Sequence, residues 1–471
     1  MLNNSLNLQH FNIKSIQNKK HSNKEAFKIF KPNSKFKIQN SKLMNFFPYN
    51  PDRAIDLPVS KSIGARYLVA SFFAGNLQDC PEFTDCDDLK VIQKALLSIR
   101  EKATPSGSAT VGIDLHASGT AFRFVTAVAA STPGATFIVT GTPRLCSRPM
   151  SPLLDVLRKA GAEIEAMGEN GTGPYRVAGG NLTGGDFEIR GDVSSQFISA
   201  LMLVAPTWEN GMRLRFTTPL VSRPYAEMTA EVMRKFGIEV CLSEDGVEVK
   251  QGAYTAPVGF KVEADWSAAG FFYEAAAFLL DQVDISGLVA PEESLQGDAA
   301  TAKFFEKLGV VSRFEVEGAS IMRCEELPDY LEADLTDNPD LAPAFAVACV
   351  LNASRFKFTG VRNLRLKECD RLAAIQAEFG KLGYPIDVSD DTIEWRGGAW
   401  SVDCPVIETY DDHRIAMAFA IAALRLPEVK IKCPDVVNKS FEDFWNQLPK
   451  LGLTCRREGD IMIVEQENPG W

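Results

Sequence analysis

The stretch DDHRIAMAFAIAAL at residues 411–424 joins a polar head to an alanine-rich apolar run of helical length. Alanine lets a helix pack closely against its neighbours, and Asp is a favoured residue at a helix start. We therefore expect a buried helix with a polar N-terminus here. The pattern recurs as SKSIGARYLVASFFA from Ser60, SGTAFRFVTAVAA from Ser118, SSQFISALMLVAP from Ser194, WSAAGFFYEAAAF from Trp266 and NPDLAPAFAVACV from Asn338.

These runs predict an internally repeated α/β fold. After a shorter first interval they recur at roughly 70-residue spacing, which is typical of an internal repeat. Strand-like segments such as 135–140 and 356–358 alternate with helix-like segments such as 152–160 and 371–382. We expect two domains of three repeats each.

The composition excludes several classes of protein. The chain has 471 residues, of which 45% are hydrophobic and 24% charged, with a net charge of −11. An acidic chain would repel a nucleic-acid backbone, so no nucleic-acid partner is expected. The longest apolar stretch, 341–351, is too short to cross a bilayer, so no membrane span is expected. The ten cysteines contain no CxxC pair, so we predict neither a zinc cluster nor a disulfide framework.

Residues 1–43 differ from the rest of the chain. They carry nine Lys against one acid, Glu25, and have no apolar signal-peptide core. We expect a disordered basic extension. A transit peptide is the alternative, although such peptides favour Arg and this stretch has none. Met44 is a second candidate start.

Basic residues lie close to the polar heads. Helix N-termini offer free backbone N–H groups and the positive end of the helix dipole, so several converging on one cleft would bind anions. In an acidic chain this placement predicts a small polyanionic ligand rather than a long polyanion. Taken singly, each residue would be an ordinary surface charge. The basic residues near the polar heads are Lys61, Arg66, Arg123, Arg223, Lys367, Arg371, Arg414 and Lys439.

Eight strings add a family resemblance. In chain order they are LPVSKSIGAR (57–66), SGTAFR (118–123), RPMSPLLDVLRKAGA (148–162), GDVSSQF (191–197), SRPY (222–225), NPD (338–340), KECDRL (367–372) and DDHRIAMAFA (411–420). Together they resemble the 5-enolpyruvylshikimate-3-phosphate synthases, as a divergent member of bacterial type. The resemblance spans about residues 50–450.

The resemblance implies a two-domain inside-out α/β barrel of the enolpyruvyl transferase type, with buried parallel helices and outer sheets. Residues 61–262 would form one domain, and 44–60 with 263–471 the other. Both substrates would bind between them, and the domains would close on binding. No cofactor is implied, and we expect a cytoplasmic monomer in the shikimate pathway, which leads to aromatic amino acids.

The family reaction joins phosphoenolpyruvate to the 5-hydroxyl of shikimate 3-phosphate and releases phosphate through a tetrahedral intermediate. By resemblance, shikimate 3-phosphate would be held by Lys61, Ser62, Arg66, Ser194, Ser195, Gln196, Ser222, Tyr225, Asp340, Asn363 and Lys367. Phosphoenolpyruvate would be held by Lys61, Gly119, Arg148, Gln196, Arg371, Arg414 and Lys439. Hydroxyls donate to phosphate oxygens, and Arg can clamp carboxylate or phosphate with two bonds.

The reaction needs an acid and a base. The resemblance places Asp340 near the 5-hydroxyl as base and Glu368 near C3 as proton donor, with Lys61 as a further proton carrier. In isolation, Asp340 would be a helix cap and Glu368 a surface acid. His413 would orient groups at the phosphoenolpyruvate site, and no metal site is implied.

Two positions depart from the family pattern. Ala117 stands where Asn is common, and Phe124 replaces the usual Pro after the motif arginine. We expect one ligand contact to lack its side chain and the helix packing to differ near Phe124.

Two alternatives remain open on sequence grounds. The related UDP-N-acetylglucosamine enolpyruvyl transferase carries a loop cysteine five residues before an Arg-Pro pair, where this chain has Pro143. Cys146 lies only two residues before Arg148. A non-catalytic anion-binding protein would not need both Asp340 and Glu368 at their motif positions.

Overall fold

The computed structural model describes residues 46–103, 110–400 and 405–467. The expected basic extension at 1–43 and the candidate start at Met44 lie outside these residues. Within them, no helix is long and apolar enough to cross a membrane, and no group of His, Cys, Asp and Glu could hold a metal ion. No disulfide joins any two of the nine described cysteines.

Four sheets share one strand order, in which the first two strands pair parallel and the others antiparallel. The first two are β1-β2-β4-β3 (Thr110–Asp114, Thr136–Thr140, Tyr175–Ala178, Glu163–Ala166) and β5-β6-β8-β7 (Gly185–Ile189, Met212–Phe216, Gly246–Val249, Val240–Leu242). The other two are β12-β13-β15-β14 (Tyr330–Asp334, Arg355–Thr359, Thr392–Trp395, Asp387–Val388) and β16-β17-β19-β18 (Val406–Ile407, Glu428–Lys432, Ile461–Gln466, Leu453–Glu458).

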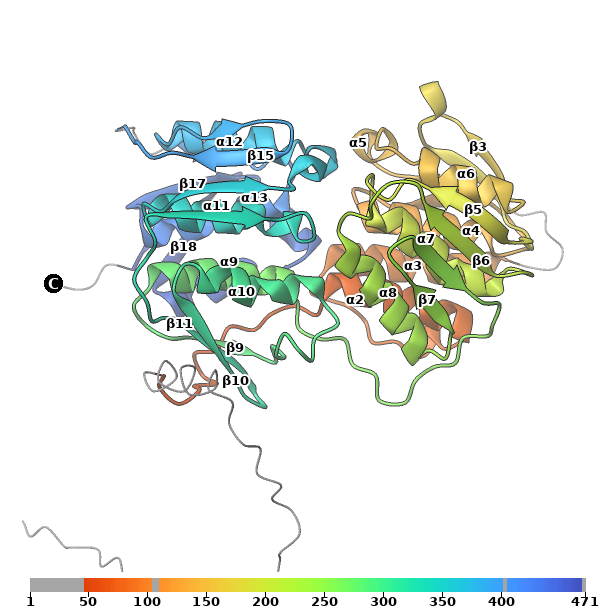
Figure 1. Cartoon of the computed structure of the whole chain (residues 1–471), viewed down its shortest axis with the longest axis horizontal. Coiled ribbons are helices and arrows are strands. Elements are labelled where there is room, and N and C mark those ends of the chain that lie inside the picture. The colour runs from red at the N-terminus through yellow and green to blue at the C-terminus, as the bar shows by residue number, and fades with distance from the viewer. Residues whose placement is uncertain (1–45, 104–109, 401–404, 468–471) are drawn as a thin grey trace, which may run out of the picture. The chain divides into compact units, whose positions relative to one another are not determined.

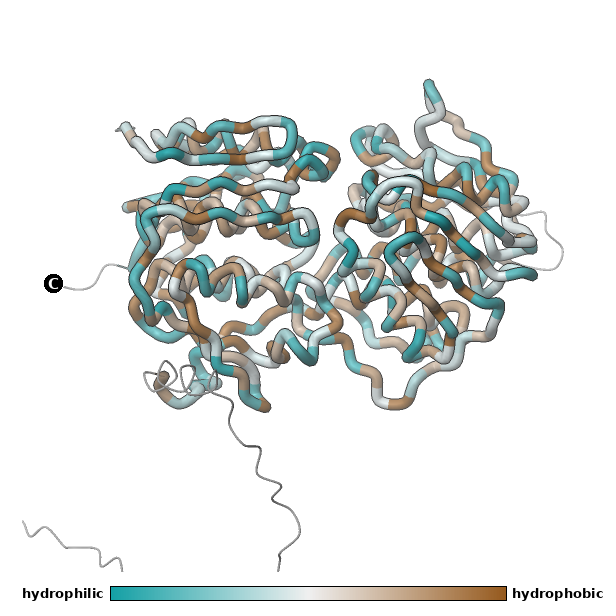
Figure 2. Tube along the Cα trace, viewed as in Figure 1, coloured by the Kyte–Doolittle hydropathy of each residue, from teal (hydrophilic) through white to brown (hydrophobic). Residues whose placement is uncertain are grey.

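A fifth sheet is wholly antiparallel. Its order is β10-β11-β9 (Val310–Phe314, Gly318–Arg323, Val283–Ser286). Polar and apolar residues alternate along strands such as β13, RFKFT. Figure 2 shows short hydrophilic and hydrophobic segments alternating along the tube. One face of such a strand is therefore buried.

All six alanine-rich runs are helical. Four of them connect the parallel strand pairs, because a parallel pair needs a crossover connection. These are α4 (Gly119–Ala130), α7 (Ser195–Val204), α11 (Ala342–Leu351) and α13 (His413–Ile421). The other two are α2 (Lys61–Ala74) and α9 (Trp266–Phe278). Side chains of Ser60, Ser118, Ser194, Asp265 and Asp412 cap five of the six.

Two further helices were predicted from the sequence, and their bounds in the structure lie within a residue or two of the predicted ones. Segments 152–160 and 371–382 correspond to α6 (Ser151–Lys159) and α12 (Arg371–Lys381). The other helices are α3 (Asp87–Lys102), α5 (Pro143–Cys146), α8 (Arg223–Lys235), α10 (Thr301–Glu306) and α14 (Phe444–Gln447).

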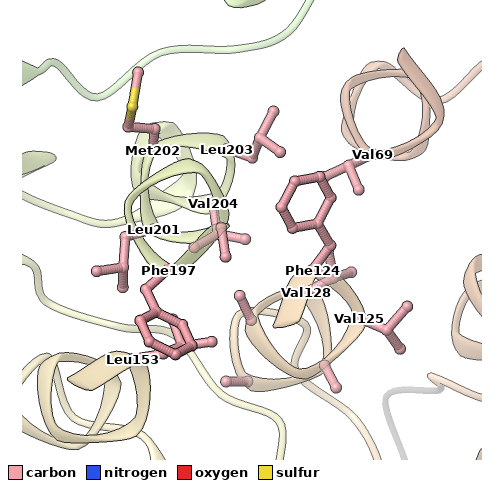
Figure 3. Packing of buried hydrophobic residues seen from close by; sticks show 14 of the residues in the cluster. Val69, Phe124, Val125, Val128, Leu153, Phe197, Leu201, Met202, Leu203 and Val204 are labelled. Atoms are coloured by element: carbon pink, nitrogen blue, oxygen red, sulfur yellow. The ribbon is translucent and has the colours of Figure 1, made fainter. Parts of the chain in front are cut away.

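The buried apolar residues form two clusters. The first runs from Ile63 to Tyr254, and the second contains Ile55 and residues from Trp266 to Val464. In the second, α9, α11 and α13 pack against one another and lie side by side in Figure 1. In the first, Figure 3 shows Phe197 of α7 near Leu153 and Phe124 of α4 near Val69 of α2. Phe124, which replaces the usual Pro, is thus a core residue, 1% exposed.

The chain passes between the two clusters in two adjacent segments, before α2 and before α9. The Ser60 amide donates to the Glu263 carbonyl at 2.7 Å, and the Asp265 amide donates to the Pro58 carbonyl at 2.9 Å. The Asp265 carboxylate accepts from the Ala268 amide of its own helix at 3.0 Å and from the Lys61 amide of α2 at 2.9 Å. One carboxylate therefore caps two helices, and both begin beside the site described below.

Asp265→Ala should lower the free energy of unfolding by about 2 kcal/mol, because two helix starts lose an acceptor at about 1 kcal/mol each. Asp370→Ala is the control, since Asp370 caps one helix, α12, through the Ala373 amide at 3.1 Å. Its other contact, with Arg365 at 2.9 Å, is a partly exposed ion pair that contributes little. Urea unfolding of both variants measures the difference. Equal losses would show that the Lys61 amide does not depend on Asp265.

Candidate functional site

Residues from both clusters line one pocket. Most lie at or just before a helix N-terminus, where the polar heads were expected. They are Lys61, Ser62, Asp88, Gly119, Thr120, Arg123, Arg148, Pro149, Val193, Ser194, Ser195, Gln196, Phe197, Ser222, Tyr225, Asp340, Asn363, Leu366, Lys367, Glu368, Arg371, His413 and Arg414. All the site residues that the resemblance implies, except Arg66 and Lys439, are among them. Of the basic residues noted near the polar heads, Arg223 also lies outside the pocket, where it pairs with Glu227 at 2.8 Å.

Lys439 lies at the edge of the same site. Its ammonium donates to Glu368 at 3.0 Å and to the Ala117 carbonyl at 3.1 Å. Ala117 therefore contributes a backbone oxygen where the family commonly has an Asn side chain. These two contacts connect Lys439, in the C-terminal part of the chain, to the residue before the second string (118–123) and to the seventh string (367–372).

Arg66 lies behind the pocket wall and is 2% exposed. Its guanidinium donates to the Ser62 carbonyl at 2.7 Å, the Tyr225 carbonyl at 3.1 Å and the hydroxyls of Ser199 and Thr229 at 3.0 and 2.7 Å. It also lies over the Phe124 ring at 5.5 Å. Arg66 thus holds two lining residues in place through their backbones.

Arg371 is the centre of the ionic contacts in the second cluster and is 1% exposed. It pairs with Asp412 at 2.6 Å, Asp340 at 2.7 Å and Glu368 at 2.8 Å. Asp412 also caps α13 through the Arg414 amide at 3.0 Å. The start of α13, the Asp340 turn and the KECDR string are therefore oriented by one guanidinium.

Asp340 is surrounded by cations. Lys367 lies 3.0 Å and Arg414 3.6 Å from its carboxylate, besides Arg371. Burial by itself would raise the pKa of Asp340, but Lys367, Arg414 and Arg371 outweigh it and hold the pKa below its usual range. Asp340 is therefore held as a carboxylate that accepts hydrogen bonds, and it becomes a stronger proton acceptor only when part of this positive charge is taken up by a ligand.

Glu368 is held in the ionised state in the same way. Burial would raise its pKa, but Lys439, Arg371 and Arg148 together leave the pKa well below its usual range. A proton donor must carry a proton, so the predicted role of Glu368 requires a change in this charge balance. Binding of an anion beside these cations would supply that change.

Two buried guanidiniums lack any ion pair among the described residues. Arg148 donates to the Leu366 carbonyl at 3.2 Å, and Arg123 to the Gly119 and Pro149 carbonyls at 2.8 and 3.4 Å. The Nε atoms of both are buried without a hydrogen-bond partner in that part of the chain. Burial and the charge of Arg148 lower the pKa of Arg123 well below its usual range. Two adjacent desolvated cations favour an anion between them.

Lys61 and His413 complete the floor of the pocket. Lys61 pairs with Asp88 at 3.3 Å; although burial opposes it, Asp88 raises the pKa of the ammonium. Burial and the charge of Lys61 lower the pKa of His413 well below its usual range. Its Nδ1 has no hydrogen-bond partner among the described residues and lies 3.9 Å from the Asp412 carboxylate, so the lowered pKa, rather than a hydrogen bond, favours the neutral ring. Lys61 therefore remains a cation beside a neutral ring.

Sequence reasoning missed several of these groups. Asp88 and Asp412 orient Lys61 and Arg371, yet neither was assigned a role. Asp412 had a signal, since it immediately precedes His413 in DDHR, but Asp88 lies in an ordinary acidic first turn of α3. Arg123 was noted as a basic residue without an assigned ligand. These contacts join segments far apart in sequence, so no local pattern reveals them.

The solved structures support the fold assignment. An EPSP synthase from Acinetobacter baumannii matches with a TM-score of 0.64 at 22% identity, covering 87% of this chain and 97% of that one. A second EPSP synthase structure from this organism gives a TM-score of 0.63 at 21% identity. The mixed α/β fold is therefore that of EPSP synthases.

Comparison with known sequences agrees over most of the chain. A 3-phosphoshikimate 1-carboxyvinyltransferase of Bacteroides fragilis is 40% identical over 402 residues, 85% of this chain and 95% of the relative. One from Hamiltonella defensa is 32% identical and covers 88% of this chain and 100% of the relative. One from Methanococcus maripaludis is 34% identical and covers 72% and 80%. Because the family model for EPSP synthase (3-phosphoshikimate 1-carboxyvinyltransferase) also matches residues 52–448, the chain belongs to this family.

Proposed function

We propose that the pocket carries out the reaction of its family, transferring the enolpyruvyl group of phosphoenolpyruvate to the 5-hydroxyl of shikimate 3-phosphate with release of phosphate. One observation carries the assignment of the reaction to this pocket. Two buried guanidiniums, Arg123 and Arg148, form no ion pair with any described residue and lie in the same pocket as two carboxylates that are paired with cations. The two guanidiniums suit the binding of anionic substrates, and the two carboxylates suit proton transfer.

Phosphoenolpyruvate binds in this proposal between the two clusters. Arg148, beside Gly119, takes one end of the anion, while Arg371, Arg414 and Lys439 take the other. Lys61 and Gln196 complete the site. Arginine clamps a carboxylate or phosphate with two parallel bonds, so a ligand carrying both groups uses both ends.

Shikimate 3-phosphate binds against the first cluster. Its phosphate faces the hydroxyls of Ser194, Ser195 and Ser222, since hydroxyls donate without adding charge. The α7 N-terminus, where Ser194 and Ser195 lie, adds free backbone N–H groups. The Ser222 hydroxyl is not used to cap α8. Ring and carboxylate contacts fall to Lys61, Ser62, Gln196, Tyr225, Asn363 and Lys367, with Arg66 acting through Ser62 and Tyr225.

Asp340 acts as the base for the 5-hydroxyl, and Glu368 delivers the proton to C3. Substrate anions compete for Lys367, Arg371, Arg414 and Lys439, which hold both carboxylates ionised in their absence. An added negative charge disfavours ionisation, so the pKa of Glu368 rises on binding. Glu368 then takes a proton from solvent before it protonates C3. Lys61 carries a further proton at the phosphate side.

The domain organisation completes the proposal. Residues 61–262 form one domain and 44–60 with 263–471 the other, each built from three repeats around buried parallel helices. The contacts of Arg148 with the Leu366 carbonyl and of Lys439 with the Ala117 carbonyl are the kind that closure would make. The enzyme works as a cytoplasmic monomer without a cofactor, toward aromatic amino acids.

Purified chain given phosphoenolpyruvate should release phosphate with shikimate 3-phosphate and not with UDP-N-acetylglucosamine. A phosphate assay of both mixtures measures this. Release only with the nucleotide sugar would mean that the acceptor site is that of the related transferase. Release with neither acceptor would leave a non-catalytic anion-binding protein.

Glu368→Gln should lower kcat by about 100-fold or more, because general acid catalysis contributes on this scale. Both substrates should still bind, since the amide keeps the side-chain shape. Initial rates together with titration calorimetry separate the two effects. Glu394→Gln is the control, as Glu394 also pairs with an arginine, Arg396, but lies outside the pocket. A near-normal kcat in Glu368→Gln would reject its role as proton donor.

Gly119→Ala should raise the KM for phosphoenolpyruvate. A Cβ at this position would lie 2.5 Å from Arg148 Nη1 and 3.1 Å from Arg123 Nη1, so both guanidiniums must move. We expect a rise of about 10-fold, the equivalent of one charge-assisted hydrogen bond. In Gly112→Ala, the control, a Cβ meets no atom within 4 Å. An unchanged KM in Gly119→Ala would show that Arg148 does not hold this substrate.

A further inference from the structure

Asp298 is a partly buried acid beside the pocket to which the proposed mechanism gives no role. It lies in the single helical turn Gly297–Ala300, which precedes α10. That turn belongs to the second cluster, yet it contacts the N-terminus of α8, which belongs to the first. Asp298 therefore lies where the two clusters meet.

Its carboxylate accepts hydrogen bonds from three uncharged groups. The Tyr225 hydroxyl donates to both oxygens, at 3.2 and 3.1 Å. The Ser267 hydroxyl of α9 donates to Oδ2, and the Asn338 amide approaches Oδ1 at 3.5 Å. Among the described residues Asp298 forms no ion pair, unlike Asp340 and Glu368. It is therefore arranged to orient neutral donors rather than to neutralise a cation.

The approach of α8 to this turn is close and depends on a glycine. A Cβ on Gly297 would lie 2.1 Å from Pro224 Cβ, so any larger residue would push the turn away from α8. Beside it, the Ser222 amide donates to the Thr336 carbonyl at 3.2 Å, and the Arg223 amide to Asp337 at 3.3 Å. The start of α8 is thus docked on the second cluster, with Asp298 under Tyr225.

The backbone and the ring of Tyr225 are held from opposite sides. The Tyr225 carbonyl accepts from Arg66 and Thr229 of the first cluster at 3.1 and 2.7 Å. The hydroxyl of the same residue is bound by Asp298 of the second. Burial, together with Asp298, raises the pKa of Tyr225 well above its usual range, so the phenol keeps its proton to donate.

We propose that Asp298 is a positioning residue for shikimate 3-phosphate. By accepting the hydrogen bond of the Tyr225 hydroxyl, Asp298 fixes the ring of Tyr225 in the pocket wall. Because Asp298 belongs to the second cluster and Tyr225 to the first, this contact forms only when the two clusters are together. This inference rests on the proposed function, since it names Tyr225 as a contact of that substrate. Asp298 itself does not line the pocket. Its effect on substrate binding is therefore indirect.

The same carboxylate is connected to the proposed base. Asn338 donates to the Gly297 carbonyl at 2.9 Å and lies two residues before Asp340. The turn that carries Asp298 thus supports the Asp340 turn from behind. Loss of the Tyr225 contact leaves the hydrogen bond from the Asn338 side chain to the Gly297 carbonyl intact. An effect on substrate binding can therefore be separated from an effect on kcat.

The test is a double-mutant cycle between Tyr225→Phe and Asp298→Ala in the full chain, with Asp298→Asn as the conservative variant. The KM for each substrate comes from phosphate release, and the Kd of shikimate 3-phosphate comes from calorimetry without phosphoenolpyruvate. Each single change should raise the KM and Kd for shikimate 3-phosphate about 10-fold, the scale of one hydrogen bond to a charged group. The KM for phosphoenolpyruvate should change less than about twofold, a difference of a few tenths of a kcal/mol.

The double variant should lose no more affinity than Asp298→Ala alone, because Tyr225→Phe removes only a contact that Asp298→Ala has already removed. Asp298→Asn should recover part of the loss, since its carbonyl oxygen can still accept from Tyr225. Tyr273→Phe is the control: it removes a buried hydroxyl contact, with Ser312 at 2.7 Å, outside the pocket, and should change neither constant.

Three results with the variants would overturn the assignment. An unchanged KM for shikimate 3-phosphate in Asp298→Ala would do so, as would losses that multiply to about 100-fold in the double variant. Equal rises in KM for both substrates would indicate a general structural role. If the wild-type chain neither binds shikimate 3-phosphate nor releases phosphate, the proposed function is rejected and this assignment with it. If the wild type is active and its variants have the same KM and Kd for shikimate 3-phosphate, only the assignment is rejected.

Discussion

The burial of Arg371 is the constraint on which the site depends. Removing a guanidinium from water is costly unless its donors are paired with well-placed acceptors. Its Nε and both Nη atoms reach Asp412, Asp340 and Glu368, which come from three separate segments of the second cluster. None of these segments can shift alone without leaving a buried charge without its partner. The positions of the proposed acid and base are therefore linked to each other through one side chain.

The charge of the pocket is opposite to that of the chain. Its described lining contains six cations (Lys61, Arg123, Arg148, Lys367, Arg371 and Arg414) and three acids (Asp88, Asp340 and Glu368), while the chain as a whole carries −11. A local excess of positive charge inside a negative protein attracts small anions into the pocket without attracting long polyanions to the surface. It also explains why the unpaired cations, Arg123 and Arg148, are tolerated there: in this proposal they are paired when substrate is bound.

Local sequence patterns were sufficient for the buried helices, whereas most of the lining residues were named by the family resemblance, whose motifs lie at the starts of those helices. A Ser, Asp or Asn before an alanine-rich run indicates a capped, buried helix, and that helix start faces the site. Asp298 and Asp88 had no such feature, since their importance comes from contacts with Tyr225 and Lys61, distant in sequence. The sequence also could not show which way Arg66 points. The guanidinium of Arg66 donates its hydrogen bonds to Ser62, Ser199, Tyr225 and Thr229, so Arg66 supports the pocket wall from behind.

The shared guanidinium has a consequence for the order of proton transfers. Asp340 and Glu368 both depend on Arg371 for their charged state, so they titrate as a coupled set rather than as independent acids. An anion that takes up part of the positive charge of Arg371 raises the pKa of both carboxylates. Lys367, which is not part of the proposed phosphoenolpyruvate site, still faces Asp340, whereas Lys439 and Arg148, which are part of it, face Glu368. A ligand that occupies Arg148 and Lys439 therefore raises the pKa of Glu368 more than that of Asp340. Binding of phosphoenolpyruvate at those residues would then separate the two carboxylates into a proton donor and a proton acceptor, which is the arrangement that addition to its double bond requires.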